Sequence, residues 1–171
     1  MIEAVNAGQS QIEAIRGAGI TYVTGVPDSL FKPLIAALEA TELDRLYVRA
    51  TREDHAIALA AGAWLAGEQP LVFMESSGIG TAVDALTSLA LVYGMPIVLF
   101  IGWAGYQGRD VPHHNVIGEP LPGLLEALGV PRVEVVMPGP DVEPLRAALA
   151  GAVERARAES RPVAVLGIPR S

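Results

Sequence analysis

The sequence predicts one α/β domain, a doubly wound layer of six mainly parallel strands with helices on both faces. Helical and extended segments alternate almost to the end of the chain, which is typical of a parallel sheet covered on both sides. Hydrophobic residues make up 51% of the 171 residues and aromatic residues only 5%, which indicates an aliphatic core large enough for one domain. No linker, repeat or low-complexity tract divides residues 1–171.

Each element is predicted from its local pattern. Helices are expected where apolar residues recur at helical spacing, at residues 4–18, 30–39, 54–65, 79–92, 120–128 and 142–158. Strands are expected in short apolar or β-branched runs, at residues 22–24, 45–48, 71–74, 97–101, 133–136 and 163–166. Residues 138–140 predict a turn, and residues 102–119 predict a long irregular loop rich in glycine. Loops of that length in a compact domain are usually functional or disordered.

Charge and composition exclude several classes of function. The formal net charge of −7, without any basic run, argues against binding of nucleic acid. The absence of cysteine excludes disulfides and thiolate metal sites, and the N-terminus does not resemble a signal peptide, so a cytoplasmic protein is expected. Residues 86–106 carry no formal charge, but Gly94-Met95-Pro96 interrupts them. A buried helix followed by a buried strand is therefore expected there rather than a membrane span.

Glu53 is the most informative residue, because it lies where an extended segment gives way to a strongly apolar helix. One interpretation is a capped helix start, with Thr51 as the N-cap and with Glu53 and Asp54 stabilised by the positive end of the helix dipole. The other is a carboxyl group in a partly dry pocket at the carboxyl end of a strand, where ligands bind in open α/β sheets. The residues next to Glu53 are compatible with both interpretations.

Four turns at the carboxyl ends of the expected strands are predicted to converge on a shared cleft. They span residues 25–29, 51–55, 75–80 and 102–119. In the first turn, Asp28 or Ser29 caps the next helix, or else the backbone faces a ligand. The third turn consists of small residues whose backbone amides can approach a ligand closely, although it matches neither a Walker loop nor a dinucleotide fingerprint.

The remaining polar candidates are two histidines and two cations. His113 and His114 are adjacent, and adjacent histidines rarely chelate one ion, so no metal site is expected in this chain. They are either a surface pair or proton donors that work near neutral pH. Lys32 and Arg109 are ordinary surface charges unless the substrate is anionic.

Together these segments resemble the pyrimidine-binding domain of the thiamine-diphosphate-dependent 2-keto acid decarboxylases. The order matches: a Gly-Val-Pro turn after the first strand, a glutamate after the second, a Gly-x-Gly turn after the third, and Pro-Ile-Val leading into a glycine-rich loop. The segments GVPDSL (25–30), REDHA (52–56) and ESSGIG (75–80) are most similar to the phosphonopyruvate and sulfopyruvate decarboxylases. The resemblance covers essentially the whole chain and implies the thiamine-diphosphate-binding fold of the pyrimidine-domain type.

The resemblance also implies a role for individual residues. Glu53 matches the glutamate that hydrogen-bonds N1′ of the cofactor's aminopyrimidine and relays a proton there. His113 and His114 are similar to the paired catalytic histidines of pyruvate-type decarboxylases, and which of the two is functional stays open. The implied cofactor-binding residues are Gly25, Val26, Pro27, Glu53, Ser76, Ser77, Gly78 and Ile79. The implied substrate-binding residues are Asp28, Ser29, Lys32 and Arg109.

One departure from the family pattern concerns the other half of the site. The cofactor's diphosphate and Mg²⁺ are normally held by a Gly-Asp-Gly segment, which this sequence lacks. We therefore expect a separate β subunit to supply the diphosphate-binding domain and Mg²⁺ in a hetero-oligomer, so that this chain is the α subunit of a carboxy-lyase active only with its partner. The expected reaction converts 3-sulfopyruvate, a small anionic 2-keto acid, to sulfoacetaldehyde and carbon dioxide.

Three alternatives stay open. The first is that the substrate is 3-phosphonopyruvate, which would give phosphonoacetaldehyde. The second is that the chain is a non-catalytic regulatory subunit of the same fold. The third alternative is an α/β domain that binds a small molecule or nucleotide and has no relation to thiamine.

Overall fold

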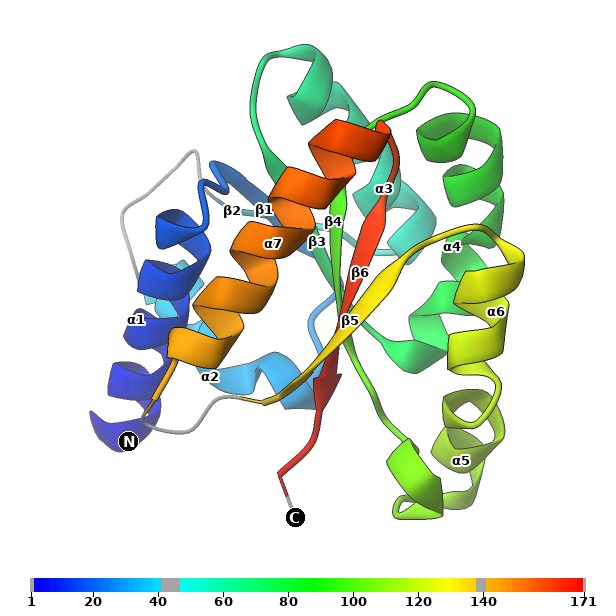
Figure 1. The fold of residues 1–171 in the computed structure, drawn as a ribbon. Helices are drawn as coiled ribbons and strands as arrows, with labels where there is room; N and C mark the ends of the chain where they lie inside the picture. Colours follow the sequence, from blue (N-terminus) through cyan, green and yellow to red (C-terminus); the bar gives the residue numbers. More distant parts are fainter. Residues whose placement is uncertain (1, 41–46, 138–140, 171) are drawn as a thin grey trace.

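The computed structural model describes residues 2–40, 47–137 and 141–170, and it has a central sheet of six strands (Figure 1). The strands are β1 (Tyr22–Gly25), β2 (Tyr47–Arg49), β3 (Pro70–Glu75), β4 (Val98–Gly102), β5 (Arg132–Val136) and β6 (Val163–Ile168). Their order is β2-β1-β3-β4-β6-β5, and every pairing is parallel. All six strands therefore end on the same edge of the sheet, at the bottom of Figure 1.

Helices and short helical turns connect the strands. The helices are α1 (Ile2–Gly17), α2 (Lys32–Ala40), α3 (Glu53–Leu65), α4 (Ile79–Ala85), α5 (Pro112–Gly118), α6 (Leu121–Ala127) and α7 (Glu143–Glu159). The short turns are the 3₁₀ segments η1 (Ser29–Phe31), η2 (Ser76–Gly78) and η4 (Tyr106–Gly108), together with the π-helical segment η3 (Leu86–Leu91). The predicted α/β architecture with a parallel sheet is confirmed.

The sheet separates two hydrophobic cores, because successive side chains of a strand point to opposite faces. In β3, Leu71 and Phe73 pack in the core with α1, α2 and α7. Val72 and Met74 pack in the second core with α3, α4 and α6. Figure 1 shows α1 and α7 on one side of the sheet and α4 and α6 on the other. Burial on both faces explains why the central strands are apolar without alternation.

The predicted helix at residues 79–92 is present but changes its hydrogen bonding halfway. It begins as α4 and continues as the π-helical segment η3. The Thr87 hydroxyl donates to the Val83 carbonyl at 2.9 Å, and the Ser88 hydroxyl donates to the Asp84 carbonyl at 2.6 Å. Hydroxyl groups that bond to carbonyls one turn earlier compete with the regular helical ladder, which accounts for the change.

The prediction of an irregular loop at residues 102–119 is wrong in its second half, where the chain forms α5. Pro112 occupies the first turn of this helix, a position where its missing N–H costs nothing. Predicted strand residues 45 and 46, and the predicted turn at residues 138–140, lie outside the described residues. The other predicted elements are present with ends shifted by one or two residues.

The contact between α1 and α2 provides a test of the first core. A Cβ atom on Gly8 would lie 2.1 Å from the carbonyl oxygen of Pro33 and 2.7 Å from the Cβ of Ala37. We expect Gly8→Ala to lower the free energy of unfolding by about 1–3 kcal/mol, measured by urea denaturation, because the two helices must move apart.

Gly151→Ala in α7 is the matched control, since its Cβ would meet nothing within 4 Å. This change should raise the free energy of unfolding by about 0.5–1 kcal/mol through the higher helix propensity of alanine. Equal effects of the two changes would contradict the close packing of α1 on α2.

Candidate active site

Glu53 begins α3 directly after the short strand β2, and its side chain is partly buried. Its carboxyl group lies against Gly78 of η2, because a Cβ on Gly78 would approach Glu53 Oε1 to 2.6 Å. The interpretation of Thr51 as the N-cap is wrong. Arg52 occupies the cap position without a side-chain hydrogen bond, and Asp54 bonds to the amide of the next residue and to Arg52. The first turn of α3 thus leaves the Glu53 carboxylate free for a ligand at the edge of the sheet.

The turn after β1 confirms the capping interpretation of Asp28. Its Oδ1 accepts a hydrogen bond of 2.8 Å from the amide of Leu30 and so caps η1. Gly25 lets this turn start close to β3, because a Cβ there would lie 2.2 Å from the carbonyl oxygen of Phe73. Val26 is partly buried and Pro27 exposed, so the turn presents both backbone and side chain at the carboxyl edge. The chain after β1 continues to α2 on one face of the sheet, and the chain after β3 continues to α4 on the other face. In open α/β sheets, the point between two such neighbouring strands is the usual ligand-binding crevice.

The small-residue turn η2 connects three of the four predicted turns. Ser76 is fully buried, and its hydroxyl donates to the carbonyl of Ala104 in the loop after β4, at 3.1 Å. Ser77 is exposed, while Gly78 and Ile79 are buried. Since Gly78 also contacts Glu53, η2 brings together the segments that follow β2, β3 and β4. A Cβ on Gly102 would in turn lie 2.8 Å from Leu30 Cδ1, which adds the turn after β1. The four predicted turns are thus joined by contacts at the carboxyl edge of the sheet. A cleft shared by all four stays a prediction.

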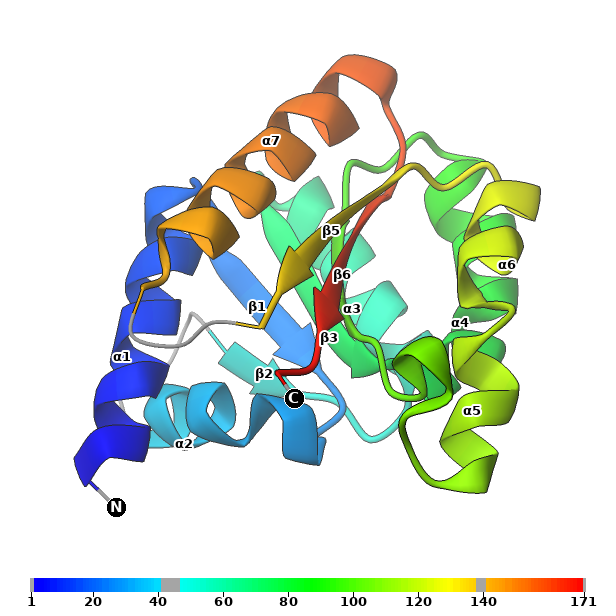
Figure 2. The same ribbon diagram turned by 60° about the horizontal axis from the view of Figure 1, so that its bottom comes forward.

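The loop after β4 packs closely on α5 through two glycines. A Cβ on Gly105 would lie 2.1 Å from the carbonyl oxygen of His114, and Gly105 has a positive φ of 77°. A Cβ on Gly118 would lie 2.4 Å from the carbonyl oxygen of Ala104. The indole N–H of the buried Trp103 donates to the Gly118 carbonyl at 2.8 Å. These contacts fix where α5 sits, and Figure 2 shows α5 beside the carboxyl ends of the strands.

The two histidines of α5 differ in their surroundings. His113 is exposed, and its ring centroid lies 4.3 Å from that of His114. His114 is partly buried, with Nδ1 3.0 Å from Asp110 Oδ1 and Nε2 3.5 Å from Glu75 Oε1. The prediction did not include Glu75 or Asp110 as site residues. The spacing of four residues between Asp110 and His114 is the signal that could have identified Asp110.

The Asp110 carboxylate is held by backbone amides as well. Val111 N donates to Oδ1 at 2.7 Å and Gly105 N donates to Oδ2 at 3.0 Å. These amides, with that of Val111 first, lower the pKa of Asp110, and the His114 side chain lowers it further. Asp110 is therefore an anion at neutral pH that is fixed in place beside His114.

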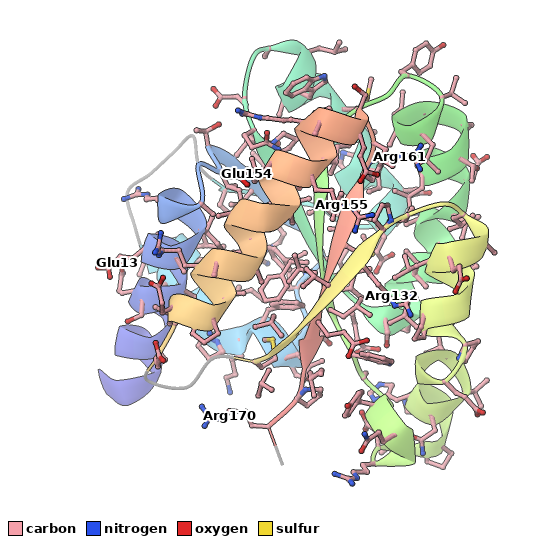
Figure 3. The ribbon with its side chains drawn as sticks, viewed as in Figure 1. Glu13, Arg132, Glu154, Arg155, Arg161 and Arg170 are labelled. Carbon is pink, nitrogen blue, oxygen red and sulfur yellow. The ribbon has the colours of Figure 1, made fainter. Side chains whose placement is uncertain are left out.

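The predicted substrate-binding cations line different hollows. Arg109 is exposed and lines a hollow of about 520 Å³ together with Leu30, Tyr106, Asp110 and residues of the C-terminal segment, among them Arg170. Lys32 lies with Asp28 and Ser29 at a separate hollow of about 360 Å³ beside α2. Figure 3 shows Arg170 after the end of β6, extending toward the side of α1 and α2. Nothing in the sequence pattern pointed to Arg170.

Two general properties complete the description of the residues that the structure describes. They contain no group of three or more His, Asp or Glu side chains that could hold a metal ion. None of their helices combines the length and the apolar character that crossing a membrane requires.

The fold and the site define an α/β domain that presents a carboxylate, a turn of small residues and a carboxylate-flanked histidine at the topological switch of a parallel sheet. Residues 5–123 match the family described as "Thiamine pyrophosphate enzyme, N-terminal TPP binding domain". The chain belongs to this family, which confirms the resemblance found in the sequence.

Relatives with assigned activities include sulfopyruvate decarboxylases and phosphonopyruvate decarboxylases. The chain is 30% identical to the sulfopyruvate decarboxylase subunit alpha of Methanococcus maripaludis over 127 residues, and this alignment covers 74% of this chain and 75% of that protein. It is 36% identical to the phosphonopyruvate decarboxylase of Streptomyces viridochromogenes over 116 residues, and that alignment covers 67% of this chain but only 29% of the relative. The chain thus spans less than a third of the length of this second relative.

Solved structures share the fold. A putative thiamin diphosphate-dependent enzyme from Mycobacterium smegmatis superposes with a TM-score of 0.64 at 24% identity, covering 95% of this chain and 30% of the other. The thiamine diphosphate-dependent 4-hydroxybenzoylformate decarboxylase of Rhodococcus jostii RHA1 gives 0.64 at 23% identity, with the same coverage. At this level of identity the likeness concerns the fold alone.

The contact between Glu53 and Gly78 provides a test of the cofactor site. In Gly78→Ala the new methyl group would displace the Glu53 carboxyl group, which is the movable end of a side chain. We expect the free energy of unfolding to fall by less than about 1 kcal/mol, and the affinity of the assembled protein for thiamine diphosphate to fall about tenfold, measured by calorimetric titration.

Gly80→Ala, two residues further in α4, is the control because its Cβ would meet nothing within 4 Å. It should leave the affinity unchanged. Equal affinities for both variants would show that the position of the Glu53 carboxyl group does not matter for the cofactor.

Proposed function

We propose that this chain is the pyrimidine-binding α subunit of a thiamine-diphosphate-dependent 2-keto acid decarboxylase that converts 3-sulfopyruvate to sulfoacetaldehyde and carbon dioxide. The observation that carries the proposal is the Glu53 carboxylate, which lies against Gly78 at the edge of the sheet where parallel strands bind ligands. Support for the substrate comes from the relative in Methanococcus maripaludis, a sulfopyruvate decarboxylase subunit alpha that matches over 75% of its length.

The residues at this edge fit the pyrimidine half of the cofactor. A carboxyl group can exchange a proton with a ring nitrogen. Within the described part of the chain, no hydrogen bond to another residue occupies the Glu53 carboxylate. Backbone at Gly25, Val26 and Pro27 and at the η2 turn would hold the ring, since glycine and serine leave room there. When bound, the cofactor supplies an acceptor for the electron pair that loss of carbon dioxide leaves on the keto carbon.

His114 would supply the proton that replaces the lost carboxyl group. It is partly buried and lies between two carboxylates, whereas His113 is exposed. A proton donor for this step must work near neutral pH, which suits histidine. We assign this role to His114 Nε2 because Nδ1 lies closer to its carboxylate, 3.0 Å from Asp110 Oδ1, than Nε2 does to Glu75 Oε1, at 3.5 Å.

The diphosphate of the cofactor and its Mg²⁺ would be held by a second subunit. The sequence has no Gly-Asp-Gly segment, and the relatives from Methanococcus maripaludis and Methanocaldococcus jannaschii are named as alpha subunits. A hetero-oligomer in which the partner contributes the diphosphate-binding domain accounts for both observations.

An anionic substrate needs positive charge in a chain whose formal net charge is −7. Arg109 and Arg170 both line the hollow of about 520 Å³ at the carboxyl edge. We infer that this hollow receives the sulfonate group, because guanidinium groups bind such oxyanions with paired hydrogen bonds. Two other arginines already have partners. Arg155 lies on α7 and donates to Glu159, and Arg161 follows the C-terminal end of α7 and donates to the Gly129 carbonyl (Figure 3).

Replacement of Glu53 tests the proposed function in the complex reconstituted with a diphosphate-binding subunit, thiamine diphosphate and Mg²⁺. The complex should decarboxylate sulfopyruvate, and this chain alone should not. Glu53→Gln should leave assembly intact and slow the exchange of the cofactor's C2 proton by at least about 100-fold, measured by deuterium exchange, because the amide cannot relay a proton.

Asp54→Asn is the matched control, since it removes the neighbouring charge from an exposed pair with Arg52. It should exchange at the rate of the unchanged complex. Decarboxylation by this chain alone, or equal exchange rates in both variants, would overturn the proposal. If the complex turned over phosphonopyruvate faster than sulfopyruvate, the assignment as a decarboxylase would stand and the proposed substrate would be wrong.

Replacement of the two arginines tests how the anionic group is recognised. Arg109→Ala and Arg170→Ala should each raise KM for sulfopyruvate about tenfold or more and change KM for pyruvate little, because pyruvate lacks the second anion. Steady-state kinetics of the complex would measure both constants.

Arg155→Ala removes the same charge from α7, away from the hollow, and should change neither constant. A rise in KM only for Lys32→Ala would move the anionic group to the hollow beside α2. Unchanged KM in all four variants would place substrate recognition on the partner subunit.

A further inference from the structure

His114 stands between two carboxylates that come from different parts of the chain. Asp110, in the loop before α5, faces Nδ1 at 3.0 Å, and Glu75, the last residue of β3, faces Nε2 at 3.5 Å. The side chains are 25% exposed for His114, 29% for Asp110 and 15% for Glu75. Glu75 is thus the most buried member and the one that sequence spacing does not connect to the histidine.

Two atoms of the cluster lack a hydrogen bond of good geometry. Glu75 Oε1 and His114 Nδ1 are both buried and unpaired within the described part of the chain. A buried polar atom without a partner is costly, and such atoms in folded proteins usually have a role. The His114 ring lies next to Glu75 Oε1, with Nε2 at 3.5 Å, so a small rotation of either side chain would bring the two atoms into hydrogen-bond geometry.

We propose that Glu75 is a positioning residue for His114, holding the Nε2 side of the ring while Asp110 holds the Nδ1 side. The proposal deepens the proposed function and rests on it for the role of the ring in catalysis. Asp110 fixes the ring orientation, because backbone amides of Gly105 and Val111 hold its carboxylate. Glu75 then faces the nitrogen that is left to exchange a proton.

The position of Glu75 links this cluster to the cofactor side of the site. It immediately precedes η2, whose Ser76 bonds to the Ala104 carbonyl and whose Gly78 contacts the Glu53 carboxyl group. A single turn of the chain therefore sets the places of Glu53 and of the His114 ring. The exposed His113 has no carboxylate contact of this kind among the described residues, which distinguishes the two histidines.

The charged and titratable groups around His114 are few. Glu75 faces it from the end of β3, Asp110 from the preceding loop and His113 from its own helix, with the ring centroids 4.3 Å apart. α5 also packs against η4, whose titratable residue is Tyr106. Removing the charge of Glu75 leaves Asp110 as the one carboxylate in contact with the ring among the described residues.

The experiment records the ¹⁵N ring signals of the histidines by NMR in the full chain at one fixed pH, for the unchanged protein and for Glu75→Gln. The isosteric change replaces the carboxylate that faces Nε2 by an amide, so the His114 Nε2 signal should shift. His55, exposed on α3, serves as the internal reference and should not move. Glu126→Gln, which changes an exposed carboxylate on α6 in the same way, is the matched control and should leave His114 unchanged.

Glu75→Asp keeps a carboxylate and should restore most of the original His114 signal. His114 ring signals that are the same in Glu75→Gln and Glu126→Gln would overturn the proposal, whatever the activity of the complex. In the reconstituted complex, Glu75→Gln should lower kcat about tenfold and change KM little, because a positioning residue acts on the proton-transfer step. An unchanged kcat with a shifted ring signal would overturn the catalytic part alone. The ring signals need no decarboxylase activity, so failure of the proposed function is recognised separately.

Discussion

Parallel hydrogen bonding across all six strands is the constraint on which the rest of this molecule depends. It sends every strand in one direction, so each strand-to-helix turn emerges at the same edge. The central strands β3 and β4 are buried on both faces, and a slip of one residue would turn each of their side chains to the opposite core. The register of β3 against β4 therefore fixes where η2 and the glycine-rich loop meet.

Close approaches at glycine convert this shared edge into a defined site. At Gly78 the missing side chain makes room for the Glu53 carboxyl group, and at Gly105 it makes room for the backbone of α5. The first contact joins residues 25 positions apart and the second joins the loop after β4 to the helix that follows it, and neither needs a special sequence pattern beyond a small residue. This explains why the individual motifs are weak indicators while their combination agrees with the match to the N-terminal thiamine-pyrophosphate-binding domain.

Charges of both signs meet at the carboxyl edge of the sheet. Glu53, Glu75 and Asp110 place carboxylates around the turn η2 and around His114. The guanidinium groups of Arg109 and Arg170 line the neighbouring hollow, and Asp110 lines it as well. Asp110 therefore lies between the histidine and the two arginines. The low pKa of Asp110, caused first by the amide of Val111, keeps the histidine next to a permanent anion.

The sequence by itself determined the alternation of helices and strands, the parallel sheet, and the position of Glu53 at the start of α3, because these follow from hydrophobic period and local turn chemistry. It also predicted a cap at Asp28 or Ser29, and the structure has Asp28 in that place. It misjudged Thr51 and the second half of the loop at residues 102–119. Only the tertiary structure formed α5 against Gly105, separated Lys32 from Arg109, and brought Glu75 to His114. Those outcomes depend on packing between segments that are distant along the chain, which no local pattern encodes.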